Sequence, residues 1–434
     1  MLIQDLRSCL FIALYAIVGI GFAAAQPTFR VISYLNQLQV PVGLTEASPE
    51  IFYSIGGAAT EAAFSITPQG SITILATFPN QYTALSQLVE GSNGRFYTSI
   101  EYLNDPASVV SLGSTPGTRK IFPPQSLGPS FAQNLPDGSL FAVSSWFGPW
   151  YLDKIDLNDN VTTIYQFPSG EAPSSSAFYG SDGNYYGLSM LSSGSGYVYR
   201  VTPSGSRTNL YTFSGNVFGT SYPTPILQAS DGNLYGTTTK GGAYGAGTIY
   251  KVSLAGQYTL LYTFPKSTSS FAPTALIEAS DGNLYGATIG GNSQLFRITK
   301  SGVYTLLRTM NLYTDGECQC ELIQGSDGNI YGTAQMGGTY GGGDIFVLEA
   351  GLPKPAPRAQ HFSPQSGAVG AKVRIWGQNL LSASVEFNGV PAASVSNAGP
   401  NYVWATVPSG ASTGPITVTT PGGTVTTIAS FTVE

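Results

Sequence analysis

The residues of this chain that could carry chemistry are acidic, and many of the acids recur at one kind of position. A set of aspartates is followed directly by glycine, namely Asp137, Asp182, Asp231, Asp281 and Asp327. Aspartate before glycine favours a tight turn, in which its carboxylate bonds nearby backbone N–H groups. A calcium loop needs alternating ligands, Asp-x-Asp-x-Asp, and the sequence has no such run. Turn formation therefore explains these carboxylates, and we predict no metal site and no cofactor.

A second set of polar residues stands three positions before the turns: Glu46, Glu90, Asn134, Gln228, Glu278 and Gln324. We expect these side chains to line a central channel near one face of the molecule. An enzyme needs acids, bases or ligands that converge. The single histidine, His361, stands near an expected domain junction, where packing or solvation explains it. We therefore predict a solvated channel lining and no catalytic residue, with Glu278 as the residue that an enzyme hypothesis would have to use.

Glycine is concentrated in the stretch 229–250, "ASDGNLYGTTTKGGAYGAGTIY". A phosphate-binding loop lies between a strand and the start of a helix. Here strand-forming residues follow the glycines, and no Lys-Ser or Lys-Thr pair closes the loop, so we assign the glycines to hairpin turns. The 18 Lys and Arg are scattered through a chain of net charge −6. This distribution lacks the basic stripe of a nucleic-acid-binding protein.

The motif "SDGNLYG" at 230–236 is one of seven in-phase copies, spaced 44 to 50 residues apart. Each copy has an aromatic residue in the same place: Tyr53, Tyr97, Phe141, Tyr186, Tyr235, Tyr285 and Tyr331. A period of this length indicates a repeat architecture. Each unit holds about four strands, expected in the sixth unit over 275–279, 283–289, 294–299 and 303–309. Four antiparallel strands per unit are typical of a β-propeller blade. We predict an all-β fold in which residues 26–350 form a seven-bladed β-propeller and the recurring aromatic rings are buried.

The seventh unit lacks a fourth strand. Its third strand, expected over 344–350, runs into the Pro-rich linker 351–357, which resists both helix and central strand. The segment "TFRVISYL" at 28–35 reads as a strand that belongs to no unit. We predict that it supplies the outermost strand of the last blade, which closes the ring and covers an exposed edge.

Two resemblances to known families add to this interpretation. The segments 230–252 and 326–348 resemble the Gloeobacter/Verrucomicrobia (GloVer) repeats of bacterial surface proteins. That resemblance implies an exported protein with an interchangeable anchoring segment, and it implies no biochemical activity. Residues 358–434 resemble an IPT/TIG domain, in residues such as Pro364 and Gly377 and in the segments "VEFNG", "TVP" and "FTV". This resemblance implies an Ig-like β-sandwich in the place of the family's anchor.

The first 25 residues predict a signal peptide. Arg7 precedes an apolar run at 10–22, and three alanines then provide the small residues that signal peptidase needs before Gln26. The run is short for a transmembrane helix, and no later segment reaches that length. We expect an exported mature chain without a membrane span, located in the extracellular space, at the cell surface or in the periplasm.

Two cysteines, Cys318 and Cys320, would remain after cleavage. Export favours their oxidation. Their spacing lies near the upper limit for a disulfide in an extended strand, so a bridge would require a local turn. We expect the pair to be structural, with either redox state open.

Aromatic residues in turns supply the candidate binding site. The glycine-rich turns between second and third strands share one face with the connections between blades. The aromatic residues expected on that face are Trp146, Phe147, Trp150, Tyr244 and Tyr340. Exposed aromatic side chains are typical of surfaces that contact glycans or proteins. The competing interpretation is that they fill the space between neighbouring blades.

We therefore expect an exported, non-enzymatic binding or adhesion protein of the bacterial cell surface or extracellular space, with a glycan or a surface protein as partner. Two alternatives remain at this point. One is a structural surface component without a discrete ligand, and the other is a glycan-acting propeller enzyme.

Overall fold

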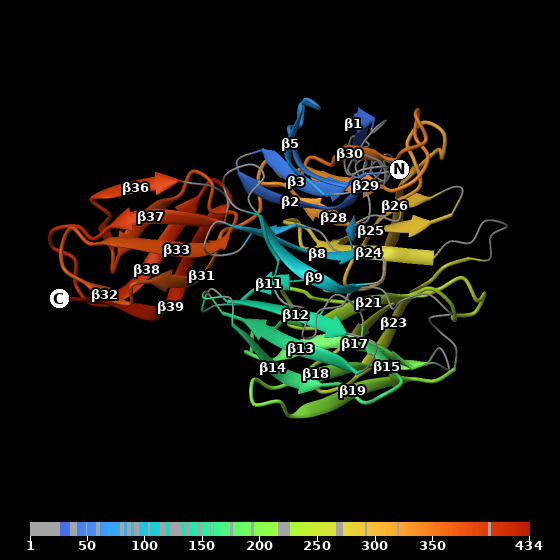
Figure 1. The fold of residues 1–434 in the computed structure, drawn as a ribbon, viewed down its shortest axis with the longest axis horizontal. Coiled ribbons are helices and arrows are strands. Elements are labelled where there is room, and N and C mark those ends of the chain that lie inside the picture. The colour runs from blue at the N-terminus through green and yellow to red at the C-terminus, as the bar shows by residue number, and fades with distance from the viewer. Residues whose placement is uncertain are drawn as a thin grey trace, which may run out of the picture.

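The computed structural model is built from β-strands joined by turns (Figure 1). No helix occurs among the residues that it describes, and hence none that is long and apolar enough to cross a membrane. The predicted signal peptide lies outside these residues. The structure describes residues 27–34, 41–48, 50–57, 61–78, 82–84, 88–90, 95–102, 105–112, 119–121, 132–135, 137, 139–145, 149–156, 158, 160–173, 177–191, 195–215, 226–265, 272–290, 293–318, 321–397 and 401–434.

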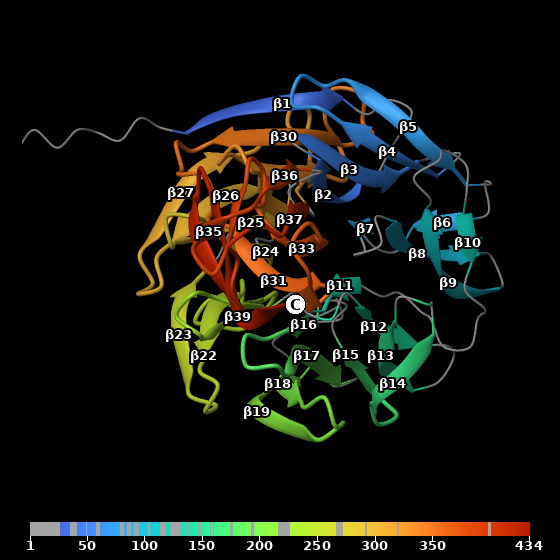
Figure 2. The same cartoon turned by 90° about the vertical axis from the view of Figure 1, so that its left-hand side faces the viewer.

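Within the described residues, seven sheets of four or five strands follow one another around a ring (Figure 2). The first sheet holds β2 (Val42–Ser48), β3 (Ile51–Gly56), β4 (Ala62–Ile66) and β5 (Ile72–Thr77), and the second holds β6 (Tyr82–Ala84), β7 (Val89–Glu90), β8 (Phe96–Tyr102), β9 (Asp105–Leu112) and β10 (Arg119–Ile121). The third holds β11 (Ala132–Asn134), β12 (Leu140–Ser145), β13 (Trp150–Ile155) and β14 (Val161–Gln166), and the fourth holds β15 (Glu171–Pro173), β16 (Phe178–Tyr179), β17 (Tyr185–Leu191), β18 (Gly196–Val201) and β19 (Arg207–Phe213). The fifth holds β20 (Leu227–Gln228), β21 (Leu234–Thr238), β22 (Thr248–Val252) and β23 (Tyr258–Thr263), and the sixth holds β24 (Ala272–Glu278), β25 (Leu284–Ile289), β26 (Gln294–Ile298) and β27 (Tyr304–Thr309). The seventh holds β28 (Leu322–Gln324), β29 (Ile330–Ala334), β30 (Asp344–Glu349) and β1 (Thr28–Tyr34).

The sixth sheet shows how the repeat produces strands. Its four strands lie close to the ranges that the sequence predicts and pair antiparallel in chain order. The turn between β24 and β25 passes through Gly282 at a φ of +76°. Glycine adopts this left-handed conformation without steric cost, which is why the Asp-Gly pair reverses the chain here.

The N-terminal strand completes the seventh sheet. Strand β1 pairs antiparallel with β30, as predicted for residues 28–35. Strand β1 also contacts the next sheet in the ring, as the outer strands of other sheets do. A Cβ on Gly70, between β4 and β5, would lie 2.5 Å from the backbone oxygen of Ile32 in β1. In the same way, a Cβ on Gly205 would lie 2.7 Å from the backbone oxygen of Ile164 in β14. Strand β1 therefore occupies the position of a fourth strand.

Aromatic side chains fill the space between neighbouring sheets. The repeat tyrosines are buried, as predicted: Tyr186 and Tyr235 are 0% exposed, Tyr331 1% and Tyr285 3%. The ring of Tyr331 packs against Phe52 of the first sheet, with 4.1 Å between centroids. Contact between the first and seventh sheets thus has the same character as contact elsewhere in the ring.

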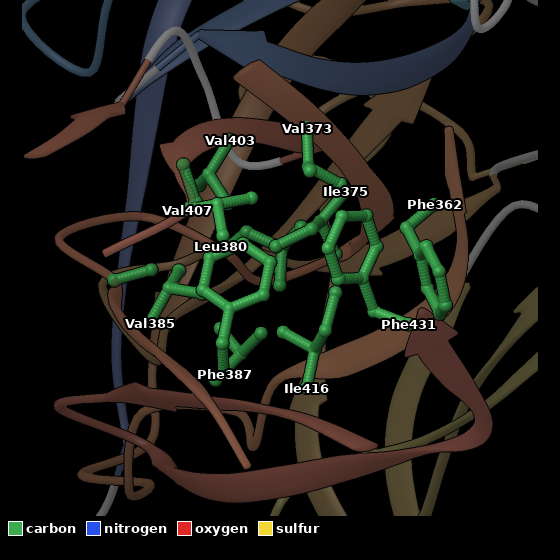
Figure 3. Close-up of a cluster of buried hydrophobic side chains, with 13 residues drawn as sticks. Phe362, Val373, Ile375, Leu380, Val385, Phe387, Val403, Val407, Ile416 and Phe431 are labelled. Carbon is green, nitrogen blue, oxygen red and sulfur yellow. The ribbon is translucent and has the colours of Figure 1, made fainter. Parts of the chain in front are cut away.

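Residues 358–434, the C-terminal module, form two further sheets. One has the strand order β31 (Arg358–Ser363), β33 (Lys372–Gln378), β37 (Tyr402–Thr406) and β36 (Ser394–Asn397), and the other β32 (Ser366–Gly367), β39 (Gly423–Val433), β38 (Gly414–Thr420), β34 (Ser384–Phe387) and β35 (Val390–Pro391). Buried residues alternate along β33, because successive side chains point to opposite faces of a strand. Apolar side chains from both sheets meet in one core, which includes Ile375, Val403, Phe387 and Ile416 (Figure 3).

Candidate functional site

The recurring aspartates are structural turn residues in the described copies of the strong motif. Asp231 Oδ1 accepts a hydrogen bond from the Asn233 backbone N–H at 3.1 Å. Its Oδ2 accepts one from Asn233 Nδ2 at 2.9 Å and one from the Tyr235 hydroxyl at 2.8 Å. Burial alone would raise the pKa of Asp231, but these donors lower it below the usual range. The copies at Asp182, Asp281 and Asp327 have the same bonds. The carboxylates are therefore committed to the fold.

The polar residues three positions before the turns join neighbouring sheets. Glu278 of the sixth sheet accepts hydrogen bonds from the backbone N–H and the hydroxyl of Ser230 in the fifth, both at 2.7 Å. In four pairs the side-chain oxygen accepts a hydrogen bond from the serine backbone N–H, and we call them the latch pairs: Gln228 with Ser181, Glu278 with Ser230, Gln324 with Ser280, and Glu46 with Ser326. The last pair joins the first sheet to the seventh. The sequence predicts a solvated channel lining for these residues, whereas the structure has them bonded across sheets.

The charged latch residues differ in their electrostatic surroundings. Burial raises the pKa of Glu46, although the hydrogen bonds from Ser326 act in the opposite direction. Glu278 instead forms an ion pair with Lys300 at 2.5 Å, and Lys300 also donates to the hydroxyl of Ser230 at 2.7 Å. A free carboxylate pair, as a glycosidase would use, is therefore not formed by these two residues.

The C-terminal module and its linker contact the ring on the face that carries the latch pairs, which we call the latch face. The side-chain amide of Asn401 donates to Glu90 Oε2 at 2.7 Å and to the backbone oxygen of Glu46 at 3.1 Å. In the linker, the backbone oxygen of Pro353 accepts a hydrogen bond from the Ser280 hydroxyl at 2.5 Å. Figure 2 shows the module in front of the middle of the ring. The linker and the module therefore lie against the inner strands of the ring.

A cavity of about 820 Å³ lies between the ring and the module. Sites for small molecules commonly measure about 300–1,000 Å³. The ring contributes the latch residues and the apolar side chains of Leu227, Leu276 and Ile323. The linker and module contribute Arg358 and Gln378, among others. The cavity thus combines an apolar wall with carboxylate, amide, hydroxyl and guanidinium groups, a composition that suits a hydroxyl-rich ligand.

Two of the lining side chains have hydrogen-bonding capacity to spare. Among the described residues, no hydrogen bond or ion pair engages the side chain of Arg358 or of Gln378. Both are exposed rather than packed in the core of the module. By contrast, the neighbouring Asn379 donates to the backbone oxygen of Ala356 at 3.0 Å. Arg358 and Gln378 are therefore the groups best placed to bind a ligand in the cavity.

The predicted aromatic site is only partly described. Trp146 and Phe147 lie outside the described residues. Trp150 is half-buried and packs against the core shared by the third and fourth sheets. Tyr244 and Tyr340 are 59% and 63% exposed, in the glycine-rich turns of the fifth and seventh sheets. In each of these sheets the second strand begins at the latch face and ends at the glycine-rich turn. Both tyrosines therefore lie on the face away from the module.

Two other predicted residues have structural surroundings. Cys318 is buried and disulfide-bonded, while Cys320 lies outside the described residues. His361 stacks on Trp376 with 5.3 Å between ring centroids, and burial lowers its pKa. The packing interpretation of His361 is therefore correct. The latch serines were not predicted from the sequence, although each directly precedes its turn aspartate.

Solved structures that resemble this chain are β-propeller proteins. A streptogramin B lyase superposes with a TM-score of 0.56 at 17% identity, over 75% of this chain and 98% of the other. The WD40 β-propeller domain of Doa1 superposes with a TM-score of 0.51 at 12% identity, over 74% of this chain and 97% of the other. At these identities the likeness shows the fold alone, and the two include an enzyme and a WD40 domain.

No curated protein matches the sequence. The family model of the Gloeobacter/Verrucomicrobia repeat matches residues 136–354, which is half of the chain. This range contains the strong copies of the Asp-Gly-Asn-x-Tyr turn and the latch pairs of the fourth to sixth sheets. The chain belongs to the Gloeobacter/Verrucomicrobia repeat family.

Proposed function

We propose that the ring is a seven-bladed β-propeller closed by its N-terminal strand, and that the C-terminal module is an Ig-like sandwich of the IPT/TIG type. Seven in-phase sequence repeats, the β1–β30 pairing and the β-propeller neighbours support the first part. The shared core of two sheets supports the second. We further propose that residues 1–25 direct export, so that the protein acts outside the cytoplasm.

We propose that the protein is a non-enzymatic glycan-binding protein of the cell exterior, with the ligand in the cavity between ring and module. The observation that carries this proposal is the cavity of about 820 Å³, bordered by the unengaged side chains of Arg358 and Gln378. Guanidinium and amide groups donate well to sugar hydroxyls and acidic sugar carboxylates. The apolar wall formed by Leu276 and Ile323 would contact the sugar rings.

A glycan array probed with residues 26–434 tests this proposal, followed by calorimetric titration of the best glycan. The double variant R358A/Q378A should lose binding at least tenfold while its melting temperature stays within about 1 °C, because surface substitutions rarely change stability much. Binding that survives this double change would refute the cavity as the site. An array without any bound glycan would favour the structural-component alternative.

A second candidate site is the opposite face, because Tyr244 and Tyr340 are exposed there. Glycines stand beside each tyrosine in these turns. Burying such a ring against a partner would gain about 25 cal/mol per Å² of apolar surface. Loss of binding in Y244S/Y340S, with full binding in R358A/Q378A, would move the site to this face.

A glycan-acting enzyme is the weaker alternative. It would need Glu278 as an acid or base, but Ser230 and Lys300 already engage both oxygens of that carboxylate. Polysaccharide cleavage that disappears in Glu278→Gln while the fold persists would restore the enzyme hypothesis.

A further inference from the structure

A carboxylate is buried in the seventh sheet without a hydrogen-bond partner among the described residues. Asp344, the first residue of β30, is 0% exposed, and no described residue donates to either of its side-chain oxygens. An unpaired buried charge is costly, so such a group normally binds a cation, a donor or a proton. Asp344 is not among the residues that line the cavity between ring and module.

In the equivalent turn of the fifth sheet, the residue at the position of Asp344 has a hydrogen-bond partner. The two turns share the pattern Gly-Gly-x-Tyr-Gly, at 241–245 and 337–341. In the fifth sheet, Thr248 takes the place of Asp344, and its hydroxyl lies 2.8 Å from that of Thr238. Thr238 also donates to the backbone oxygen of Lys240 at 2.6 Å. In the seventh sheet, Ala334 stands at the position of Thr238. Asp344 therefore faces an alanine, which has no hydroxyl to bond it.

The backbone oxygen of Met336 lies close to Asp344. A Cβ on Gly316 would lie 3.0 Å from the backbone oxygen of Met336 and 3.6 Å from Asp344 Oδ2. Both oxygens therefore border the same glycine. On its other side, a Cβ on Gly338 would lie 2.1 Å from Asp344 Oδ2, so only glycine fits there.

A second buried carboxylate, Asp315, adds negative charge. Its Oδ2 accepts hydrogen bonds from Arg308 Nη2 at 2.5 Å and from the Asn311 backbone at 3.1 Å, and its Oδ1 from the Thr314 hydroxyl at 3.1 Å. Arg308 balances one of the two acids, which leaves one negative charge uncompensated within this group. Burial, together with Asp315, raises the pKa of Asp344 to about 7.

We propose that Asp344 is a ligand of a Ca²⁺ ion, with the backbone oxygen of Met336 as a further ligand and the carboxylate of Asp315 as a nearby negative charge. All these donors are oxygens, which hard divalent cations prefer, and an irregular glycine-rich turn suits the flexible coordination of Ca²⁺ better than the strict octahedron of Mg²⁺. Water would complete the shell. This proposal departs from the sequence-based expectation of no metal site.

The ion would fix the turn that carries Tyr340. With few charged ligands, its dissociation constant should be on the order of 10⁻⁴ to 10⁻³ M, the range of extracellular calcium modules. Calcium would thus stabilise the protein after export and order one turn on the face away from the module.

The test uses EDTA-treated chain, residues 26–434, titrated with CaCl₂ or MgCl₂ in a calorimeter and followed by thermal denaturation. We expect one Ca²⁺ per chain and a rise in melting temperature of about 2 °C at roughly ten times the dissociation constant. Mg²⁺ should have a smaller effect. No heat and no change in melting temperature with either cation would overturn the proposal.

Variants locate the effect. Asp344→Asn should lose the calcium response, whereas Asp281→Asn, in a turn whose aspartate is satisfied by the fold, should keep it. If Asp344→Asn does not fold, the double variant A334T/D344T copies the threonine pair of the fifth sheet and should fold without calcium dependence. A wild-type calcium response in Asp344→Asn or in A334T/D344T would place the ion elsewhere and refute this site.

Discussion

Replacing Tyr235 tests whether the repeat tyrosines hold neighbouring sheets together. The ring is 0% exposed and packs with Phe264 of its own sheet and Leu284 of the next. Tyr235→Ala removes this packing and the hydrogen bond to Asp231, and it should lower the free energy of unfolding by about 3–5 kcal/mol. Tyr235→Phe keeps the ring and removes only the 2.8 Å bond to the carboxylate of Asp231. It should cost about 1–2 kcal/mol, since hydrogen bonds to charged groups contribute more than neutral ones.

Urea denaturation followed by circular dichroism measures both costs. Tyr313→Ala is the matched control, because that side chain is 78% exposed and its loss should change stability by less than about 0.5 kcal/mol. A cost below about 1 kcal/mol for Tyr235→Ala would refute the role of these rings in joining the sheets. Equal costs for Tyr235→Ala and Tyr235→Phe would show that the hydroxyl, not the packing, carries the contribution.

Three further predictions concern closure, the latch pairs and acid stability. Deleting residues 28–34 exposes the edge of β30 and should lower the melting temperature markedly in a scanning fluorescence assay; an unchanged value would show that β1 does not stabilise the ring. Glu278→Ala should cost about 1–2 kcal/mol in urea denaturation, and Glu278→Gln less, because Gln228 shows that an amide can bond the latch serine; equal costs would contradict the latch. The carboxylates of Asp182 and Asp231 have pKa values below the usual range, so their stabilisation is present above the ordinary aspartate pKa and is lost as the pH falls through the lowered values. The double variant D182N/D231N should therefore show a flatter loss of stability on acidification, and a profile identical to wild type would count against this assignment.

The repeat made the ring predictable from sequence. An aromatic residue four positions after each turn aspartate or its equivalent aligns the seven repeats with one another. The second strand of each sheet is buried between neighbouring sheets, so Tyr186 and Tyr235 were expected to be buried. The missing fourth strand likewise pointed to residues 28–35, because an uncovered strand edge is unfavourable. These inferences depend on local pattern and on a rule of edge pairing.

The site was less predictable, because it depends on contacts between units. Spacing alone put Glu278 near the channel, but its serine partner, Ser230, lies 48 residues away in the next repeat. The cavity depends on how the module docks, and Asn401 contributes to that docking through hydrogen bonds to the first two sheets. Trp150 was expected on a binding face but packs against the core of the third and fourth sheets. An aromatic residue next to a turn can pack between sheets as readily as it can face a ligand.

Filling the cavity is the most direct test of the central claim, that a glycan binds between the ring and the module. Ala356 lines the cavity and its methyl group is exposed, so Ala356→Trp should occupy the space without disturbing the latch pairs. Ala243→Trp, in an exposed glycine-rich turn on the opposite face, is the matched control. In calorimetric titration with the glycan selected on the array, we predict that Ala356→Trp abolishes binding with an unchanged melting temperature, while Ala243→Trp binds as wild type. Full affinity in Ala356→Trp would contradict the account.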